Sequence, residues 1–442
     1  MTPDDAKGGM SLAIGPRASE LLALSQRYEA QCTTPEMPLV WDRAEGARIW
    51  DVDGREYIDF TSGVLVVNTG HSHPDHVAAV QAQAARLMNC YDFPSEPRIR
   101  LAKKLVEMTA PHLTKAFITN SGSEAVEIAV KIAKRYTGKY EIISFHGAFH
   151  GRTYATMSLA GKQGTKRGFG PLMPGAIHAP FCYCYRCPFR QTFPDCNYLC
   201  IDNLDVVVDT QSTGEIAALV VETYQGAGGS IIPQAGYMHR LQEWCRQRGY
   251  LFILDEVQSG FGRTGKMFGY EHFGIEPNLI CLGKGLGSGA PIAAVLGEER
   301  LMASLHPGDI SSTYGGNPLS CAAALAAIDI YEREGLAERA TETGRIMDGM
   351  FRATQQRSHF LGDVRGMGLV FGIELVQDKR TRKPAPEIAR QLVEGCFRRG
   401  LALIAPLGIH GNVIRIAPPL MIDREDAARG CAIFEDVLLG LE

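Results

Sequence analysis

The chain has 442 residues with a formal net charge of −4, and 45% of its residues are hydrophobic. This length allows a large core and two domains. The charge balance shows no excess of basic residues, which argues against a nucleic-acid partner. No stretch approaches the roughly 20 consecutive apolar residues of a membrane span, so we expect no membrane association.

The amino-terminal residues Met-Thr-Pro-Asp-Asp are acidic and lack the apolar segment of a secretory signal. The chain has 12 cysteines, too few for a disulfide framework at this length. Several of them lie in apolar runs, where a buried free thiol is the expected state. We therefore expect a reducing, cytoplasmic location.

The first part of the chain mixes helical and strand patterns, with a turn signal at Asp53-Gly54 between two strand-like runs. Apolar residues recur at helical spacing both before and after this hairpin. The pattern predicts a helix over 17–27, strands over 49–52 and 56–60, a loop over 63–74, and helices over 75–88 and 98–108.

Between residues 115 and 300, short apolar runs alternate with helical patterns. The predicted strands cover 115–119, 141–145, 216–222, 251–255 and 278–282, and the clearest helices end near 134 and span 237–248. Such alternation is typical of an α/β fold with a largely parallel, doubly wound sheet.

The remainder predicts a smaller α+β domain. Its expected helices cover 319–331, 335–357 and 385–399, with one more at the end of the chain, and its expected strands cover 364–367, 369–375, 401–404 and 412–416. We expect residues 1–60 to form an amino-terminal arm and part of the small domain. Residues 61–325 would then form the large cofactor-binding domain, and 326–442 the carboxyl-terminal small domain.

Two strand ends carry the chemistry of the predicted site. Within the stretch 251–258, a short apolar run ends in the carboxylates of Asp255 and Glu256, and the stretch 278–291 sets Lys284 among glycines. Because open α/β sheets place ligands at the carboxyl ends of their strands, Asp255 and Lys284 can face one ligand. Pyridoxal phosphate needs such a pair, a lysine for its aldehyde and an acid for its ring nitrogen. Taken singly, each residue would be an ordinary strand-end acid or a surface lysine.

Further motifs fit the same ligand. The turn Asn120-Ser-Gly-Ser-Glu124 lies between a strand and a helix, which offers backbone N–H groups and a positive helix end to a phosphate. Phe149 lies in a loop where an aromatic ring could stack on a pyridine. The strand 216–222 ends in another carboxylate, Glu222, ahead of a glycine-rich loop.

Together these motifs resemble the class III aminotransferases, pyridoxal-phosphate enzymes of fold type I, over roughly residues 38 to 440. The matching motifs include Asn-Ser-Gly-Ser-Glu-Ala, Phe-His-Gly-Arg-Thr, Leu-Asp-Glu-Val-Gln-Ser-Gly-Phe-Gly-Arg-Thr-Gly, the Gly-Lys-Gly around Lys284, Tyr-Gly-Gly-Asn-Pro and Arg415-Ile-Ala-Pro-Pro. The resemblance implies an enzyme that moves an amino group from an amino acid or ω-amino acid to a 2-oxo acid, either pyruvate or 2-oxoglutarate.

The resemblance also implies roles for individual residues. Lys284 would be the Schiff-base lysine and the proton-transfer group, and Asp255 would pair with the ring nitrogen. The other cofactor contacts would come from Ser121, Gly122 and Ser123 at the phosphate, Phe149 on the ring with His150 and Glu222 nearby, and Gln258 at the ring hydroxyl. Thr313 would reach the phosphate in a neighbouring subunit, which implies a homodimer or a dimer of dimers.

Two arginines would bind substrate carboxylates. Arg415 matches the family's substrate-carboxylate arginine, and a bidentate guanidinium pair would fix the substrate's orientation. Arg152 matches an arginine that takes a second carboxylate in 4-aminobutyrate- and ornithine-type members. Many members that use 2-oxoglutarate carry a masking glutamate where this chain has Ala227. Arg415 would therefore stay available in both half-reactions, which favours carboxylate-bearing substrates and pyruvate as an acceptor.

Other functions stay open at this point. Racemases and epimerases of the same family keep the lysine, the aspartate and the phosphate turn. Dialkylglycine decarboxylases carry a glutamine and a tryptophan where this chain has Val64 and Phe149, which weakens that alternative. Val64 and Tyr91 would shape the substrate end. A catalytically silent protein of this fold is disfavoured because Lys284 and Asp255 are both present.

Five cysteines lie close together in the sequence: Cys182, Cys184, Cys187, Cys196 and Cys200. Their spacing is compatible with a zinc or iron–sulfur site. Standard members of the family need no metal there, and free thiols are the alternative, so we expect no metal.

Overall fold

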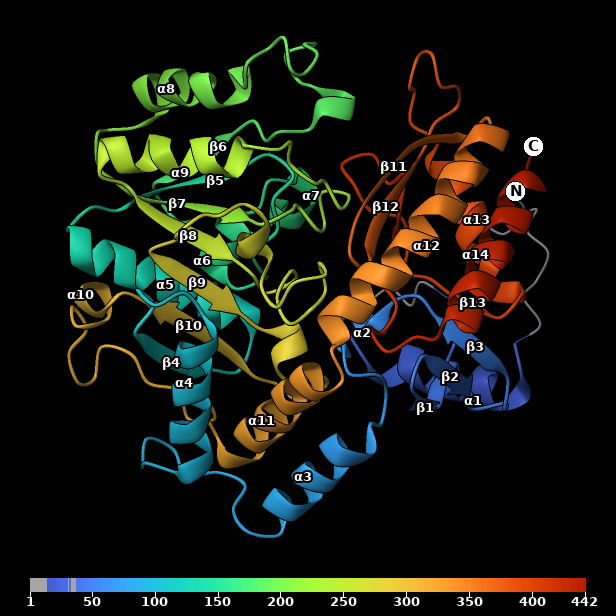
Figure 1. Cartoon of the computed structure of the whole chain (residues 1–442), viewed down its shortest axis with the longest axis horizontal. Coiled ribbons are helices and arrows are strands. Elements are labelled where there is room, and N and C mark those ends of the chain that lie inside the picture. Colours follow the sequence, from blue (N-terminus) through green and yellow to red (C-terminus); the bar gives the residue numbers. More distant parts are fainter. Residues whose placement is uncertain (1–13, 31, 33–36) are drawn as a thin grey trace.

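The computed structural model describes residues 14–30, 32 and 37–442. Strands form three sheets, of seven, four and three strands. The seven-stranded sheet lies in the larger part of the molecule, and the two small sheets lie together at its other side (Figure 1). The first 13 residues of the expected amino-terminal arm lie outside the described residues.

The seven-stranded sheet is mostly parallel, as predicted. Its order is β4-β10-β9-β8-β7-β5-β6, with bounds β4 Lys115–Thr119, β5 Glu141–Phe145, β6 Ala176–Ala179, β7 Ile216–Glu222, β8 Leu251–Asp255, β9 Leu279–Leu282 and β10 Ala293–Gly297. Strand β10 runs antiparallel to both β4 and β9. Every residue of β7, β8 and β9 is buried, which explains why these strands appear in the sequence as continuous apolar runs.

Helices cover both faces of this sheet. On one face, α5 (Gly122–Thr137) packs its apolar side against β7 to β10. On the other face lies α9 (Tyr237–Arg248), which packs on β8. Side chains alternate between the two faces along each strand, so that Ile253 of β8 joins the α5 side and Phe252 the α9 side. Both faces of the sheet are therefore covered, and the carboxyl ends of its parallel strands are left as the place for a site.

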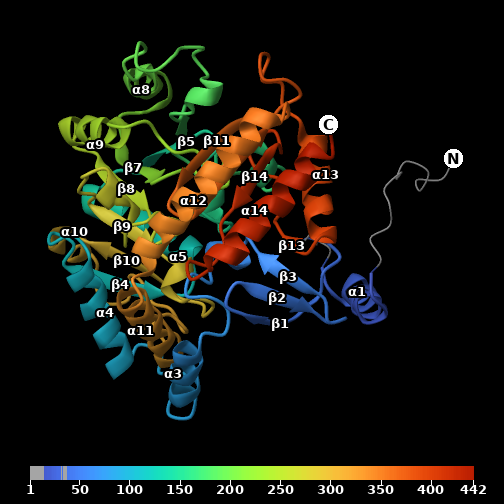
Figure 2. The same cartoon turned by 45° about the vertical axis from the view of Figure 1, so that its right-hand side comes forward.

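The small part of the molecule combines two sheets with helices, three of which come from the carboxyl-terminal part of the chain (Figure 2). One sheet has the order β1-β2-β3-β13 and the other β11-β12-β14, with bounds β1 Trp41–Glu45, β2 Arg48–Asp51, β3 Glu56–Asp59, β11 Leu361–Met367, β12 Val370–Leu375, β13 Leu401–Ala402 and β14 Val413–Ile416. The helices are α12 Leu336–Arg357, α13 Pro386–Arg398 and α14 Arg424–Leu439. Segments from both ends of the chain thus share this part.

The other helical segments connect or flank these layers. They are α1 Pro16–Tyr28, α2 Ser62–Leu65, α3 Pro74–Ala84, α4 Glu96–Met108, α6 Tyr154–Ser158, α7 Gln163–Lys166, α8 Leu199–Gln211, α10 Glu299–Met302 and α11 Pro318–Arg333, with one-turn 3₁₀ helices η1 Cys184–Arg186, η2 Gly269–His272 and η3 Lys284–Leu286. In the described part of the chain, no helix combines the length and the apolar character that a membrane crossing requires.

Most predicted elements are confirmed, several with the predicted bounds, but the sequence patterns missed some. Strands β6 and β10 and helix α8 had no prediction, and β11 begins at Leu361 rather than Val364. The predicted loop over 63–74 begins inside a short turn, α2, in which Gly63 and Val64 have positive φ angles. The expected domain boundaries stay a prediction.

Candidate active site

The carboxyl ends of β7 and β8 and the amino end of α5 meet at a cavity of about 180 Å³. Its lining comprises Ser121, Gly122, Ser123, Phe149, His150, Gly151, Glu222, Asp255, Val257, Gln258 and Lys284. Of the residues expected to bind the cofactor, all but Thr313 are in this set. The fold therefore brings together side chains that are more than 160 positions apart in the sequence.

Asp255 is held by a partner on each carboxylate oxygen. Its Oδ1 accepts a hydrogen bond from the Val257 N–H at 3.0 Å, and its Oδ2 lies 2.8 Å from His150 Nδ1. Burial by itself would lower the pKa of His150, but the hydrogen bond and the charge of Asp255 outweigh burial and raise it. A carboxylate has further lone pairs, so Asp255 can still accept from a ligand.

Lys284 is the first residue of η3, separated from the end of β9 by Gly283 alone, and has a φ of 44°. Residues other than glycine rarely have a positive φ angle, and backbone strain of this kind is common at functional sites. Burial lowers the pKa of the Lys284 amine from 10.5 to about 8, while Asp255 and Glu222 partly oppose this change and Arg415 adds to it. A lysine with this pKa has an uncharged, nucleophilic fraction near neutral pH.

The turn between β4 and α5 forms an anion site. Ser121 is the N-cap of α5, and its hydroxyl accepts the Glu124 N–H at 3.3 Å. The first N–H groups of a helix have no partner within the helix, and its amino end is positive. Gly122 packs so closely that an added Cβ would lie 2.7 Å from Val257 Cγ1. This contact places the positive helix end beside the turn that follows Asp255.

Phe149 and Gln258 line the cavity from two other segments. The Phe149 N–H donates to Glu222 Oε1 at 3.0 Å, which fixes the backbone beneath the ring. Gln258 Oε1 accepts a hydrogen bond from the Tyr224 hydroxyl at 3.2 Å. A Cβ at Gly226 would collide with the terminal amide of Gln258, so a larger residue there would displace the Gln258 side chain.

The donors and acceptors of this cavity fit pyridoxal phosphate. His150 Nε2 is buried in the cavity wall and has no hydrogen-bond partner among the described residues, as expected of a group that contacts a ligand. A helix amino end, an aromatic ring, a carboxylate and a lysine surround the same space. These are the groups that a phosphate, a pyridine ring, its nitrogen and an aldehyde require.

The predicted substrate arginines lie at different places. Arg415 is on β14 of the small part, 4% exposed, and near enough for its charge to act on Lys284. Arg152 is exposed, with its guanidinium 5.7 Å from the centre of the Phe149 ring. The structure thus brings the Arg415 guanidinium near Lys284 and the Arg152 guanidinium near the Phe149 ring.

Thr313 and Val64 do not line the cavity within one chain. Both are exposed, and Val64 has a φ of 67° in α2. Thr313 follows Ser312, whose hydroxyl accepts a hydrogen bond from Asn120 Nδ2 at 3.0 Å. Loop 310–314 therefore lies beside the anion-binding turn, but among the described residues Thr313 is exposed and does not line the cavity.

Lys162 is a site residue that sequence reasoning missed. Its ammonium donates to the carbonyl oxygens of Ala227 at 2.7 Å and Gly408 at 2.9 Å. Burial lowers the pKa of Lys162, Glu222 opposes this and Arg415 adds to it, so its charge lies near the substrate arginine. A lysine in a loop of mixed composition gives no local signal for these contacts.

The five cysteines from Cys182 to Cys200 line one small cavity together with aromatic side chains. All of them are free, and the sulfurs of Cys182 and Cys184 are 3.8 Å apart. Within the described ranges, no three histidine, cysteine, aspartate or glutamate side chains form a group that could hold a metal ion. The segment is an aromatic-rich loop that leads into α8.

Comparison with known proteins gives consistent matches. The family model described as Aminotransferase class-III matches residues 30–438. A probable 4-aminobutyrate aminotransferase of Bacillus subtilis is 40% identical over 400 residues, covering 89% of this chain and 91% of that protein. A 5-aminovalerate aminotransferase of Pseudomonas aeruginosa is 39% identical over 402 residues, covering 90% and 93%.

Solved structures agree with these relatives. An amine transaminase from an uncultivated Pseudomonas species, in its pyridoxal-phosphate-bound form, superposes with a TM-score of 0.88 at 31% identity. The match covers 94% of this chain and 98% of that one. An ornithine aminotransferase of Toxoplasma gondii gives a TM-score of 0.85 at 29% identity, covering 96% and 95%.

Proposed function

Since the chain belongs to the class III aminotransferases, and is therefore a pyridoxal-phosphate-dependent aminotransferase, we propose that its donor is an ω-amino acid and its acceptor a 2-oxo acid. The observation that carries this proposal is the convergence of Lys284, Asp255 and the anion-binding turn on one cavity, with Arg415 close to Lys284. The relatives named for 4-aminobutyrate and 5-aminovalerate support an ω-amino donor.

When bound, pyridoxal phosphate supplies an aldehyde that takes the amino group and a protonated ring that accepts electrons. In the proposed arrangement, Asp255 holds the ring nitrogen and the amino end of α5 holds the phosphate. Phe149 lies against the ring, and Gln258 contacts the ring hydroxyl. Asp255 stays fixed because His150 and the Val257 N–H occupy its two oxygens.

Lys284 would attach the cofactor covalently and then move the proton at the substrate carbon. Its lowered pKa supports both roles, because an amine with a pKa of about 8 can release and accept a proton near neutral pH. The main cause is burial, with Arg415 adding to it. A substrate carboxylate paired with Arg415 would cancel part of that positive charge, so substrate binding would raise the pKa of Lys284.

Arg415 would bind the carboxylate next to the reacting carbon. A guanidinium offers a carboxylate two parallel hydrogen bonds, which fix both position and orientation. Ala227 cannot mask Arg415 with an acid, and its carbonyl oxygen is held by Lys162. We expect 2-oxo acids, whose carboxylate adjoins the carbonyl, to use this site, while the distal carboxylate of an ω-amino acid would use Arg152.

A donor and acceptor screen tests the proposal. The purified enzyme is incubated with 4-aminobutyrate or 5-aminovalerate as donor and with pyruvate or 2-oxoglutarate as acceptor, and the amino acid product is quantified. We expect turnover only when donor and acceptor are both present, and none in Lys284→Ala. Turnover of a single amino acid without any 2-oxo acid would contradict amino transfer, and activity in Lys284→Ala would contradict the assigned lysine.

A further inference from the structure

Glu222 is a second buried acid in the cofactor pocket. It ends β7 in register with Asp255 of the neighbouring parallel strand, and it is 5% exposed. Neighbouring strands are about 4.8 Å apart and residues in register point to the same side, so two carboxylates share one buried region. Adjacent buried acids raise each other's free energy when charged, and burial raises the pKa of Glu222 to about 7. A second acid at this cost calls for a specific role.

The two oxygens of Glu222 bind two different loops. Oε1 accepts the N–H of Phe149 at 3.0 Å, and Oε2 accepts the N–H of Gly226 at 2.9 Å. Phe149 and Gly226 are 77 positions apart in the sequence, and Glu222 joins them at the cavity wall. A carboxylate can serve both donors because each of its oxygens is an acceptor, whereas a glutamine amide has one acceptor oxygen.

The first of these loops carries the groups that face the cofactor ring. Phe149 lines the cavity, and the next residue, His150, bonds to Asp255 at 2.8 Å. The loop is further held where the Gly161 N–H donates to the Ala148 carbonyl at 2.8 Å. A shift of the Phe149 N–H would therefore move the ring and loosen the His150 contact with Asp255.

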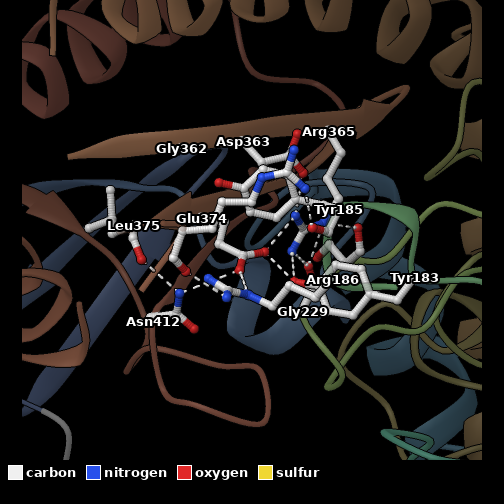
Figure 3. Close-up of polar contacts among 12 residues, drawn as sticks. Tyr183, Tyr185, Arg186, Gly229, Gly362, Asp363, Arg365, Glu374, Leu375 and Asn412 are labelled. Atoms are coloured by element: carbon white, nitrogen blue, oxygen red, sulfur yellow. Dashed lines mark hydrogen bonds and ion pairs between the residues drawn. The ribbon is translucent and has the colours of Figure 1, made fainter. Parts of the chain in front are cut away.

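The second loop, Gly226–Ser230, faces the substrate end and reaches the small part of the molecule. Figure 3 shows Arg365 against Gly229, and the Arg365 guanidinium donates to the Gly229 carbonyl at 2.7 Å. Arg365 is fixed in turn by Glu374 at 2.9 Å. The loop lies on β12 at Gly372, which pairs with Arg415 of β14. Glu222 holds the pocket end of this loop, and Arg365 holds the other end.

We propose that Glu222 is a positioning residue that holds both loops in place relative to Asp255. Its one carboxylate would fix the Phe149 ring against the cofactor and would fix the loop beside Arg415. This inference rests on the proposed function, because it assigns the cavity to pyridoxal phosphate. In this role Glu222 need not contact the cofactor itself. It holds two separate segments of the chain in place around the same ligand.

Glu222→Gln tests this role, since the amide keeps the size of the side chain but can accept only one of the two N–H groups. At a pH above the pKa of Glu222, where its carboxylate is charged, we expect the dissociation constant of pyridoxal phosphate, measured on the apoprotein by fluorescence quenching, to rise about tenfold or more, because a hydrogen bond to a charged group is lost. The visible circular dichroism of the bound cofactor should weaken as its ring loses a fixed orientation. KM for the 2-oxo acid should also rise more than kcat falls.

Glu141→Gln is the matched control. Glu141 is also buried, at the opposite end of its strand, and its two oxygens accept the N–H groups of Thr213 at 2.9 Å and Glu215 at 3.2 Å. It does not line the cavity. We expect this variant to lower Tm without changing cofactor affinity or dichroism. Equal cofactor affinity in the two variants would overturn the positioning role.

Glu222→Asp separates geometry from charge and serves if Glu222→Gln does not fold. Aspartate keeps both acceptor oxygens but is one methylene shorter, so we expect it to weaken cofactor binding as well. Wild-type affinity and dichroism in Glu222→Asp would overturn the proposal, because charge alone would then suffice. If the wild-type apoprotein fails to bind pyridoxal phosphate at Lys284, the proposed function itself fails, and this outcome is visible before any variant is compared.

Discussion

At the scale of single residues, the pocket is a set of charges that change one another's protonation. Burial lowers the pKa of Lys284, and the neighbouring Arg415 lowers it further, while Asp255 and Glu222 act in the opposite direction. Burial also lowers the pKa of Lys162, with Arg415 adding to the effect. The part of the pocket near Arg415 is therefore positively charged before any substrate binds. This charge favours the uncharged amine form of Lys284.

The lowered pKa of Lys284 predicts the pH dependence of cofactor attachment. Only the uncharged amine attacks an aldehyde, so below the pKa the rate should rise about tenfold per pH unit and then level off near pH 8. The measurement is the rate of covalent attachment of pyridoxal phosphate to the apoprotein between pH 6 and 10. Arg415→Met removes a positive charge that lowers this pKa, and should move the midpoint upward. A wild-type midpoint near 10 would contradict the environment described for Lys284.

The sequence predicts residues best where their signal is local. Asp255 and Lys284 each follow an apolar run at a strand terminus, so the pattern predicts that they meet at one edge of the sheet. The ligand could be predicted only when the phosphate turn and the other motifs were added. The partner of Asp255, His150, came from the resemblance and lies in a loop 105 positions away. Lys162 was missed because its contacts, Ala227 and Gly408, come from segments that only folding brings together.

At the scale of elements, the loop Gly226–Ser230 links the cofactor pocket to the small part of the molecule. Lys162 follows α6, and its ammonium bridges the carbonyl oxygens of Ala227 and Gly408. Leu407 is bridged to Val413, two residues before Arg415. Lys162 therefore ties together the segments that flank Arg415, and it adds positive charge where a substrate carboxylate would bind.

Lys162→Met should weaken binding of the 2-oxo acid more than binding of the ω-amino donor. Without the ammonium, the carbonyl oxygens of Ala227 and Gly408 each lose a hydrogen bond and the charge near Arg415 falls, so we expect KM for the 2-oxo acid to rise about tenfold. KM for the donor, whose distal carboxylate would use Arg152, should change little. Steady-state kinetics with each substrate varied in turn provides the measurement.

Lys134→Met is the control for this prediction. Lys134 lies on α5, its pKa is also lowered by burial, and its ammonium contacts Met173 rather than the pocket. Its replacement should leave both KM values unchanged. An equal rise in both KM values for the Lys162 variant would mean that Lys162 supports the fold in general and does not favour the 2-oxo acid.

The elements themselves show why prediction was uneven. Strands β7, β8 and β9 are buried on both faces and appear as apolar runs, so their bounds could be predicted closely. Strand β6 has four residues, Ala-Ile-His-Ala, a pattern too short and weak to stand out. Strand β10 is apolar, but its antiparallel direction depends on how the chain turns back after η3, which residue patterns do not encode.

At the scale of the whole molecule, one buried arginine joins the large and small parts. Arg263 is fully buried, and its guanidinium donates to the carbonyl oxygens of Leu369 at 2.9 Å and Pro418 at 2.6 Å. It also donates to Asn68 Oδ1 at 2.6 Å. Burial lowers the pKa of Arg263 to about 10, so it remains charged at neutral pH. A buried charge is tolerated only when it has hydrogen-bond partners, so Arg263 favours one placement of the small part, which carries Arg415, against the large part, which carries the cavity.

The whole molecule also has a surface that could form a dimer, and the role of Thr313 in a neighbouring subunit is a proposal that depends on it. Large apolar side chains are exposed along segments 87–99 and 310–314, among them Phe93 at 74% and Tyr314 at 66%. These segments adjoin, since the Tyr91 hydroxyl is 3.5 Å from Ser311 Oγ. Contiguous exposed apolar residues mark interaction surfaces. We propose that this surface faces a second copy of the chain and that Thr313 crosses from it to the partner's phosphate site.

Phe93→Asp tests this assembly, because a charge in a buried apolar interface is costly. By analytical ultracentrifugation we expect the wild-type protein to have a mass of about twice the 48.2 kDa of one chain, or a multiple of that mass. The variant should dissociate towards monomers. Since Thr313 would then be absent from the phosphate site, affinity for pyridoxal phosphate should fall with dissociation. Val206→Asp, on the outer helix α8 where Val206 is 55% exposed, should change neither property. A Phe93 variant that is monomeric but binds the cofactor as tightly as the wild type would show that each chain completes its own phosphate site, and Thr313 would then have no role across the interface.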